Sequence, residues 1–489
     1  MSSEIKRLGR HTLVYGAGVV ISKLASFLML PVYTRFLTPA DYGTLELLSM
    51  TIDVIGTLVG LGLAAGVFKF YEDYDDAPNR NEVISTATIS VVGIALVTSL
   101  TGLIFAPELT RLILEEQGQP ILFRLFFLIY LAQACEAVPL LLIRAQQRSV
   151  LFVSFSVVRL VFQLTLNILF VVGFRMGVLG VLYGNLISSG TLAVILLGYL
   201  FRQVGLGFSR EKFVAMVRFG YPMTFVSLGN FVLVFSDRYF LNYFTGTAAV
   251  GIYSLAYKFA FVLSTFAFGP FQLVWAPQRF AIAKRPDAAE IYTRVFLYLN
   301  LAMAGMALVI SLSVRDLLRV MADPAFYPAH QVVPVVLAAQ ILMQWTAFSN
   351  LGFFLRNRTG QFALASLVGV AAVTALNALL IPRFGVHGAA WATLAAYAIR
   401  FLTVYALAHR HYPIHYDWPV VARLYAVAAA ALVVRSGLGE LPLVSSLVAG
   451  SALLILAGAG AYRFVLGVED RGRVRRFIAR PRAALSLDA

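Results

Sequence analysis

Two oppositely charged side chains lie next to each other in an apolar stretch near the middle of the chain. Asp237 and Arg238 occur in the run F-S-D-R-Y-F-L-N-Y-F at 235–244, where apolar and aromatic residues predominate. A charge inside hydrocarbon costs several kcal/mol, so ionisable residues there either serve a function or form ion pairs. The position of this pair therefore indicates a binding role or a structural role.

Three basic residues in apolar runs could together bind an anion. Lys23 lies at the centre of the first run, Arg238 in the seventh and Lys258 two turns into the eighth. We expect them to line a wet cavity, with Asp237 orienting one of them. Adjacent helical positions point about 100° apart, so we expect Asp237 and Arg238 not simply to be each other's salt bridge. The alternative is a buried pair that stabilises helix packing.

A further base and two acids also lie within apolar runs. Arg159, in the fifth run, is a second candidate for the cavity. Asp53 and Glu136 are either structural partners for bases on neighbouring helices or, like Asp237, carriers of a coupling proton or sodium ion. The sequence leaves both interpretations open.

Motifs for catalysis, nucleotide binding and metal binding are absent from the sequence. It contains no G-x-x-x-x-G-K-[ST] run, no H-E-x-x-H and no cysteine cluster, since Cys135 is the only cysteine. The histidines of H-R-H-Y-P-I-H at 409–415 read as a solvated loop. We expect no catalytic residue, no metal and no cofactor, and therefore a protein that is not an enzyme.

The elements that must position these charges are membrane-spanning helices. Of the 489 residues, 60% are hydrophobic and 13% charged, whereas soluble domains are about 25% charged. Apolar runs of about 20 residues recur from end to end, the length that crosses a bilayer as a helix. They predict an all-α polytopic membrane protein with about 14 spans. The spans are expected at 12–36, 44–69, 83–105, 121–143, 150–173, 178–201, 219–244, 251–275, 290–314, 331–355, 361–381, 386–408, 419–435 and 443–466.

The distribution of Lys and Arg predicts how these spans are oriented. With a cytoplasmic N-terminus, the inside segments hold about 24 Lys and Arg and the outside segments about 7, as the positive-inside rule requires. Both termini are then cytoplasmic. Most of the Lys and Arg behind the net charge of +15 lie in the cytoplasmic segments. Membrane orientation therefore explains this charge, and we expect no nucleic-acid partner. The loop at 70–82 is acidic against the pattern, but acids contribute little to orientation.

An internal repeat divides the chain. The segment F-R-M-G-V-L-G-V-L-Y at 174–183 resembles P-R-F-G-V-H-G-A-A-W at 382–391, and F-L-T-P-A-D-Y-G at 36–43 shares its ends with F-T-G-T-A-A-V-G at 244–251. Both pairs are about 208 positions apart. Each copy holds six spans, an even number, so the copies are parallel repeats that face each other across a pseudo-two-fold axis. We expect an N-lobe at 1–201, a cytoplasmic interfacial amphipathic segment at 202–218, a C-lobe at 219–408, two additional spans at 409–467 and a basic cytoplasmic tail at 468–489.

Long stretches of the sequence are similar to one family. The segment G-R-H-T-L-V-Y-G-A-G-V-V-I-S-K-L-A-S-F-L-M-L-P-V-Y-T-R-F-L-T-P-A-D-Y-G at 9–43 and S-D-R-Y-F-L-N-Y-F-T-G-T-A-A-V-G-I-Y-S-L-A-Y-K-F at 236–259 resemble the first, seventh and eighth spans of the polysaccharide-transport (Wzx-type) oligosaccharide flippases. The resemblance implies the two-lobed fold of multidrug and toxin extrusion (MATE) carriers in the MOP superfamily. It also implies that an undecaprenyl-diphosphate-linked oligosaccharide is moved from the cytoplasmic to the outer leaflet of the bacterial inner membrane for surface polysaccharides such as O-antigen, capsule or exopolysaccharide. Basic cavity residues are a feature of the family, and Lys23, Arg238 and Lys258 fit it.

The charges agree physically with such a substrate. A lipid diphosphate carries about two negative charges that cannot cross hydrocarbon unassisted, and bases between rocking lobes would supply counter-charge. The expected partners are the lipid-linked oligosaccharide, a proton or sodium ion, and polymerase and ligase proteins in the same membrane. Two other functions stay open. A MATE-type cation or drug antiporter would need an acidic cavity, and a membrane-embedded enzyme would need acid and base groups near the outer face.

Overall fold

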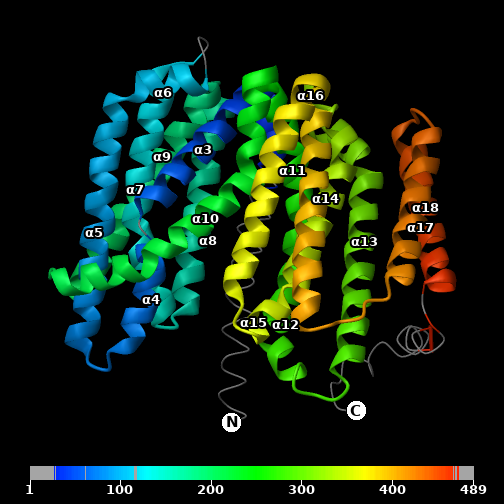
Figure 1. Cartoon of the computed structure of the whole chain (residues 1–489). Coiled ribbons are helices and arrows are strands. Elements are labelled where there is room, and N and C mark those ends of the chain that lie inside the picture. The colour runs from blue at the N-terminus through cyan, green and yellow to red at the C-terminus, as the bar shows by residue number, and fades with distance from the viewer. Residues whose placement is uncertain are drawn as a thin grey trace. The chain divides into compact units, whose positions relative to one another are not determined.

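The computed structural model describes residues 27, 29–60, 62–114, 118–465, 467 and 471–472, and every regular element in these ranges is a helix (Figure 1). Lys23 and most of the first expected span lie outside the described residues. The elements are α2 (Leu30–Phe36), α3 (Pro39–Val59), α4 (Leu63–Asp73), α5 (Ala77–Ile104), α6 (Ala106–Ile113), α7 (Pro120–Ala145), α8 (Ser149–Ile168), η2 (Leu169–Gly173), α9 (Gly177–Val204), α10 (Arg210–Thr245), α11 (Thr247–Leu263), η3 (Ser264–Phe268), α12 (Gly269–Ile282), α13 (Ala288–Met321), η4 (Pro324–Phe326), α14 (Ala329–Ser349), α15 (Leu351–Leu355), α16 (Thr359–His411), α17 (Trp418–Gly437) and α18 (Leu443–Phe464).

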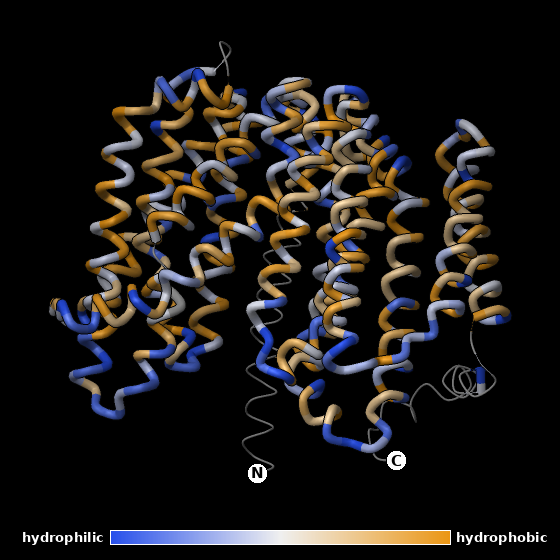
Figure 2. The backbone as a smooth tube through the Cα atoms, in the orientation of Figure 1, coloured by the Kyte–Doolittle hydropathy of each residue, from blue (hydrophilic) through white to orange (hydrophobic). Residues whose placement is uncertain are grey.

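Twelve helical segments in the described ranges are long and apolar enough to cross a membrane. One of them, α16, contains both expected spans 361–381 and 386–408, which meet at a kink at Gly385 (φ 52°, ψ −127°). The twelve segments therefore account for every expected span after the first. Hydrophilic residues gather at helix ends and loops, for example between α4 and α5 (Figure 2). The prediction of an all-α, multi-pass membrane protein is confirmed.

Two details differ from the expected spans. The run 44–69 is not one helix, because α3 ends at Val59 and Gly62 (φ 65°) starts α4 in a new direction. A Cβ at Gly62 would lie 2.2 Å from the Gly220 carbonyl oxygen, so only glycine allows α10 to come this close. The amphipathic segment expected at 202–218 contains the end of α9 and the first turns of α10. Its location in the membrane interface stays a prediction.

The repeat is visible in the backbone itself. Gln147 (φ 55°) and Asn357 (φ 53°) are repeat-related, as are Gly177 (φ 56°) and Gly385 (φ 52°). Positive φ is uncommon for residues other than glycine. Its recurrence at equivalent positions supports the two copies recognised in the sequence.

The chain divides into two compact units. Unit 1 is Met1–Leu255, Met321–Phe326 and Ser366–Ala396, and unit 2 is Ala256–Val320, Tyr327–Ala365 and Tyr397–Ala489. Each unit contains parts of both sequence repeats. The division into lobes at 1–201 and 219–408 stays a prediction.

Unit 1 is built around α7, which packs against α5 and α9, while α8 lies on α9 and α10 crosses α3, α4 and α5. One apolar cluster fills the space where α4, α5, α7, α9 and α10 meet, and includes Leu63, Val83, Val138, Leu200 and Met216. This packing fixes α8 and α9, which carry most of the polar residues considered below.

Two pairs of repeat-related residues within unit 1 make the same contact in opposite directions. A Cβ at Gly43 would lie 1.9 Å from the Thr247 carbonyl oxygen, and one at Gly251 would lie 2.0 Å from the Pro39 carbonyl oxygen. Pro39 and Thr247 have the same sequence spacing as Gly43 and Gly251. The first turns of α3 and α11 therefore cross backbone to backbone, and the reciprocity is that of a two-fold axis between them.

Polar contacts next to this crossing are reciprocal as well. The Thr34 hydroxyl donates to the Leu30 carbonyl oxygen of its own helix (2.8 Å) and also lies 3.3 Å from the Met321 carbonyl oxygen. The Asn242 amide donates to the Ile113 carbonyl oxygen (2.6 Å). Asn242 is the repeat equivalent of Thr34, and Met321 of Ile113. The glycine crossing and the two contacts between the repeats, called here the reciprocal junction, join the two repeats where α2 leads into α3 and α10 into α11.

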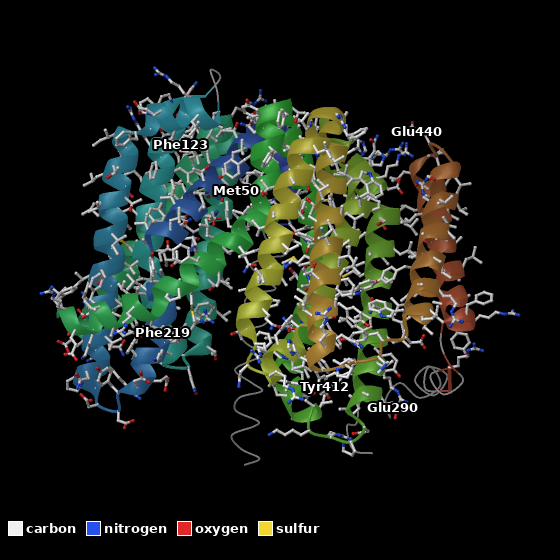
Figure 3. All side chains as sticks on the ribbon, viewed as in Figure 1. Met50, Phe123, Phe219, Glu290, Tyr412 and Glu440 are labelled. Atoms are coloured by element: carbon white, nitrogen blue, oxygen red, sulfur yellow. The ribbon has the colours of Figure 1, made fainter. Side chains whose placement is uncertain are left out.

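In unit 2, the two additional helices α17 and α18 pack on α13. Leu308 and Leu312 of α13 contact Ala431, Leu453 and Ala457 in one apolar cluster. A buried polar chain joins the same helices: Arg435 donates to the Ser446 hydroxyl (2.5 Å), which donates to Asp316 (2.6 Å). Glu440, labelled in Figure 3, pairs with Arg315 at the α17–α18 turn.

The reciprocal junction predicts that its glycines tolerate no side chain. Replacing Gly43 or Gly251 by Ala forces a methyl group into a backbone carbonyl, which should destabilise the fold by about 1–3 kcal/mol, the usual range for overpacking. Thermal unfolding of the purified protein in detergent measures this loss. Gly93→Ala is the matched control, since a Cβ at Gly93 on α5 would meet no atom within 4 Å. Equal unfolding temperatures for all three variants would contradict the close crossing.

Candidate functional site

A row of polar residues runs along one face of α8. Ser156, Arg159, Gln163 and Asn167 follow one another at intervals of three or four residues, which places them on the same side of a helix. The remainder of α8 is largely apolar. Of these four residues only Arg159 was predicted to line a cavity, although the helical spacing of the other three is present in the sequence.

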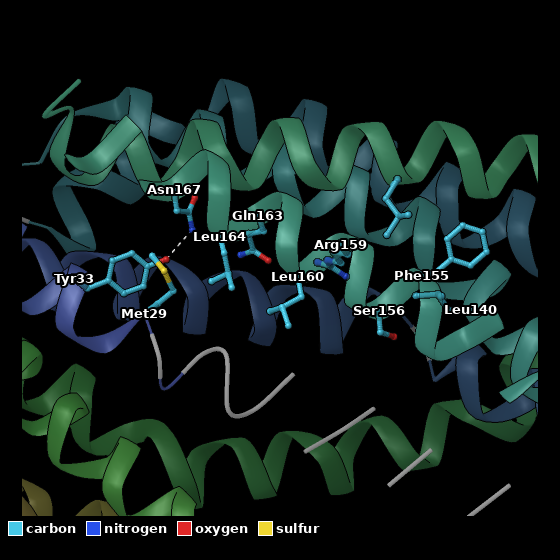
Figure 4. A pocket seen from close by; sticks show the side chains of 11 residues that line it. Met29, Tyr33, Leu140, Phe155, Ser156, Arg159, Leu160, Gln163, Leu164 and Asn167 are labelled. Carbon is cyan, nitrogen blue, oxygen red and sulfur yellow. Dashed lines mark hydrogen bonds between the residues drawn. The ribbon is translucent and has the colours of Figure 1, made fainter. Parts of the chain in front are cut away.

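This polar row lines a cavity of about 360 Å³ in unit 1 (Figure 4). The side chains come from the segment before α2, from α2 itself, and from α7, α8 and α9. They are Met29, Tyr33, Leu140, Phe155, Ser156, Arg159, Leu160, Gln163, Leu164, Asn167 and Leu192. The volume lies within the range of small-molecule sites, and a few polar groups among apolar walls are typical of such sites.

Arg159 is held in place by an acid behind it. Its Nη1 donates to Glu136 Oε2 (2.6 Å), and its Nη2 lies 3.4 Å from the Ser189 hydroxyl. Glu136 on α7 is 1% exposed, whereas the Arg159 side chain keeps 30% of its surface exposed. The two expected residues are therefore brought together, with the carboxylate buried and the guanidinium partly open. A guanidinium has five N–H donors, so further donors stay available for a ligand.

Neutral polar groups extend the site from Arg159 toward α2. The Gln163 amide donates to Asn185 of α9 (2.7 Å), and the Asn167 amide donates to the Tyr33 hydroxyl (2.8 Å), the bond drawn in Figure 4. The cavity thus combines one cation with several hydrogen-bonding groups. Such a surface can bind a ligand that has both an anionic group and hydroxyl groups.

Asp237 and Arg238 form a separate, fully buried pair on α10. Arg238 is 1% exposed, and its Nη1 donates to Asp237 Oδ1 (2.7 Å) and to the Val234 carbonyl oxygen (2.7 Å). The expectation that the two are not each other's salt bridge is wrong. Although their Cβ atoms point in different directions, the long arginine side chain folds back along the helix and reaches its neighbour.

The second oxygen of Asp237 has partners on two other helices of unit 1. The Tyr253 hydroxyl donates to Asp237 Oδ2 (2.8 Å), and the Thr393 hydroxyl lies 3.2 Å from the same atom. The Arg238 guanidinium also lies 5.1 Å from the centre of the Tyr253 ring. The pair therefore ties α10 to α11 and α16, which is the packing role that the sequence left as an alternative.

The remaining candidate residues that the structure describes lie on other helices. Lys258 is half-buried on α11, and Asp53 is exposed on α3. Lys23 is outside the described residues, so a joint site of Lys23, Arg238 and Lys258 stays a prediction. Among the residues that the structure describes, no group of three or more His, Cys, Asp or Glu could hold a metal ion.

The buried pair predicts a strong effect of removing its acid. Asp237→Asn leaves the charge of Arg238 buried without its counter-ion, which should destabilise the protein by about 3–5 kcal/mol. Asp287→Asn is the matched control: it breaks the exposed Arg285–Asp287 pair and should change little, because solvent screens such pairs. Thermal unfolding in detergent compares the two variants. An Asp237→Asn variant as stable as Asp287→Asn would show that the pair does not hold the helices together.

Comparisons with solved structures place this fold among transporters. The structure of lipid II flippase MurJ in an inward closed conformation superposes with a TM-score of 0.75 at 10% identity, covering 92% of this chain and 99% of that chain. An inward-facing multidrug resistance MATE family transporter of the MOP superfamily gives a TM-score of 0.62 at 14% identity, covering 79% and 95%. A MOP superfamily transporter from Pyrococcus furiosus gives 0.56 at 14% identity, covering 83% and 95%. The MATE-like fold implied by the sequence resemblance is confirmed, and MurJ shares it.

Comparisons of sequence identify the family. The uncharacterized membrane protein MJ1068 of Methanocaldococcus jannaschii is 22% identical over 426 residues, which cover 81% of this chain and 82% of that protein. Residues 8–282, more than half of the chain, match the family of polysaccharide biosynthesis proteins. This agrees with the resemblance to polysaccharide-transport flippases, and the chain therefore belongs to the polysaccharide biosynthesis protein family.

Proposed function

We propose that the protein is a flippase that moves an undecaprenyl-diphosphate-linked oligosaccharide across the bacterial inner membrane for the synthesis of a surface polysaccharide. The observation that carries the proposal is the polar cavity of unit 1, in which the partly exposed Arg159 lies among hydrogen-bonding side chains. Membership of the polysaccharide biosynthesis protein family supports the substrate class. No covalent step is required, so the protein acts as a carrier and not as an enzyme.

The chemistry of the cavity matches the two parts of such a substrate. The diphosphate needs a cation, because an unpaired ion in a low-dielectric medium is very costly, and Arg159 offers a planar set of donors suited to phosphate oxygens. Glu136 holds the guanidinium from behind and fixes its direction. Gln163, Asn167 and Tyr33 offer hydrogen bonds to sugar hydroxyls. Lys23 and Lys258 are proposed as further bases along the path.

The reciprocal junction suggests how access alternates. In the orientation given by Lys and Arg, both termini are cytoplasmic and the junction lies at the outer face. Thr34 of the junction and Tyr33, which lines the cavity, are adjacent residues of α2. A movement that separates Thr34 from Met321 therefore also moves one wall of the cavity. The junction would then be closed while the cavity receives substrate from the cytoplasmic leaflet.

Coupling and partners complete the proposal. Asp53 is the acid proposed to carry a proton or sodium ion, and the polymerase and ligase for the same lipid-linked sugars are proposed as partners in the membrane. A MATE-type cation or drug antiporter is the second candidate, because the fold is shared with MATE transporters. The partly exposed cation at the cavity, with its acid buried behind it, favours an anionic substrate over a cationic one.

The decisive variant is Arg159→Gln. We expect it to lower transport at least about tenfold, the effect of losing one hydrogen bond to a charged group. Delivery of surface polysaccharide in a strain lacking the chromosomal gene is measured at matched expression. Arg410→Gln, at an exposed position near the end of α16, is the control and should transport normally.

A double variant separates binding from folding. Arg159→Gln with Glu136→Gln removes both charges, so no carboxylate is left buried without its partner. If Arg159 binds the diphosphate, this variant folds but still fails to transport. Recovery of full transport in the double variant would show that Arg159 serves only to neutralise Glu136, and the proposed site would have to be abandoned.

A further inference from the structure

A second recess in unit 1 is formed by the last turns of α9 and the residue before α8. It has a volume of about 690 Å³. Arg148 immediately precedes α8 and Arg202 is in the last turn of α9. Both helices are long enough to span the membrane and they run in opposite directions, so Arg148 and Arg202 lie at the same membrane surface. We call this recess the α8–α9 groove.

The polar end of the groove is basic. Arg148, Arg202, Gln203 and Tyr199 contribute to its walls, and none of its lining residues is acidic. Arg148 Nη1 donates to the Tyr199 hydroxyl (2.7 Å), which holds this guanidinium against α9. Two guanidinium groups without an acid in the same recess attract an anion, and their planar donor sets suit phosphate oxygens.

The other end of the groove is apolar and open. Val194 is 75% exposed and Ile195 is 52% exposed, and both lie about two turns before Arg202 on α9. Gly198 lies between them and the arginines, and a Cβ there would meet no atom within 4 Å. From the membrane surface toward the interior, the groove therefore changes from charged to apolar. A phospholipid has the same order of charged headgroup and apolar acyl chain.

We propose that the α8–α9 groove binds one anionic phospholipid, with the phosphate at Arg148 and Arg202 and an acyl chain along Val194 and Ile195. Basic pockets between membrane helices bind anionic headgroups in this way. The groove is distinct from the Arg159 cavity, whose lining shares no residue with it. The inference does not depend on the proposed transport substrate.

Native mass spectrometry of the detergent-purified full chain tests the proposal, with phosphatidylglycerol as the anionic probe and phosphatidylcholine as the zwitterionic one. We expect phosphatidylglycerol to be retained preferentially. Arg148→Gln with Arg202→Gln should weaken its binding at least about tenfold, since each basic residue near a membrane surface contributes appreciably. Arg285→Gln with Arg410→Gln removes the same charge from exposed positions elsewhere and should leave binding unchanged.

Three results would overturn the proposal. The first is equal retention of the two lipids, and the second is equal loss of phosphatidylglycerol in the two double variants, which would indicate only a general effect of net charge. The third is displacement of phosphatidylglycerol by undecaprenyl diphosphate at equal concentration, together with loss of transport in the Arg148/Arg202 double variant. That result would make the groove an entry site for the transported lipid. Failure of the Arg159 variants to affect transport would leave the phospholipid site intact.

Discussion

The arrangement of unit 1 depends on one close approach, the crossing of two backbones at Gly43 and Gly251. No side chain fits between the helices there, because a Cβ on either residue would overlap a carbonyl oxygen of the other copy. The crossing brings Thr34 to Met321 and Asn242 to Ile113, so each repeat holds the other with the same contact. It also fixes α2, whose Tyr33 bonds to Asn167 at the edge of the cavity. The junction and the candidate site are therefore coupled through two adjacent residues of one short helix.

The two buried acids show how burial and exposure separate structural charges from functional ones. Asp237 uses both of its oxygens within the protein, accepting from Arg238 and Tyr253, and its arginine has almost no open surface. Glu136 is as deeply buried, but its partner Arg159 reaches a cavity and keeps part of its surface. A fully enclosed pair is suited to holding helices together. When the cation of a pair is partly exposed, some of its N–H donors can bind a ligand while others stay bonded to the acid. For this reason the proposed site is built on Arg159.

Much of the fold could be read from the sequence, because hydrocarbon imposes simple rules on helix length and charge. The length of the apolar runs predicted the spans after the first. The equal spacing of Gly43 and Gly251, and of Gly177 and Gly385, revealed an internal repeat that is also present in the backbone. The break at Gly62 was missed because hydropathy does not change there; the reason for it is the backbone of α10, which is distant in sequence.

The site was less predictable. Arg159 and Glu136 were both identified, but their pairing depends on how α7 and α8 pack, which composition does not specify. The Asp237–Arg238 pair was misjudged because Cβ directions were used where side-chain length decided the contact. The polar row of Ser156, Gln163 and Asn167 was predictable in principle, since its helical spacing is present in the sequence, yet uncharged residues give a weak signal among apolar ones.

The proposal that the protein moves a lipid-linked oligosaccharide is tested on lipid extracts. The gene is deleted from its host, and the pool of undecaprenyl-linked intermediates is profiled by mass spectrometry beside the sensitivity of the same strain to cationic drugs. If the protein is the flippase, complete, cytoplasm-facing lipid-linked oligosaccharide builds up and drug sensitivity is unchanged. An unchanged lipid pool with increased sensitivity to cationic drugs would contradict the proposal and identify a cation antiporter instead.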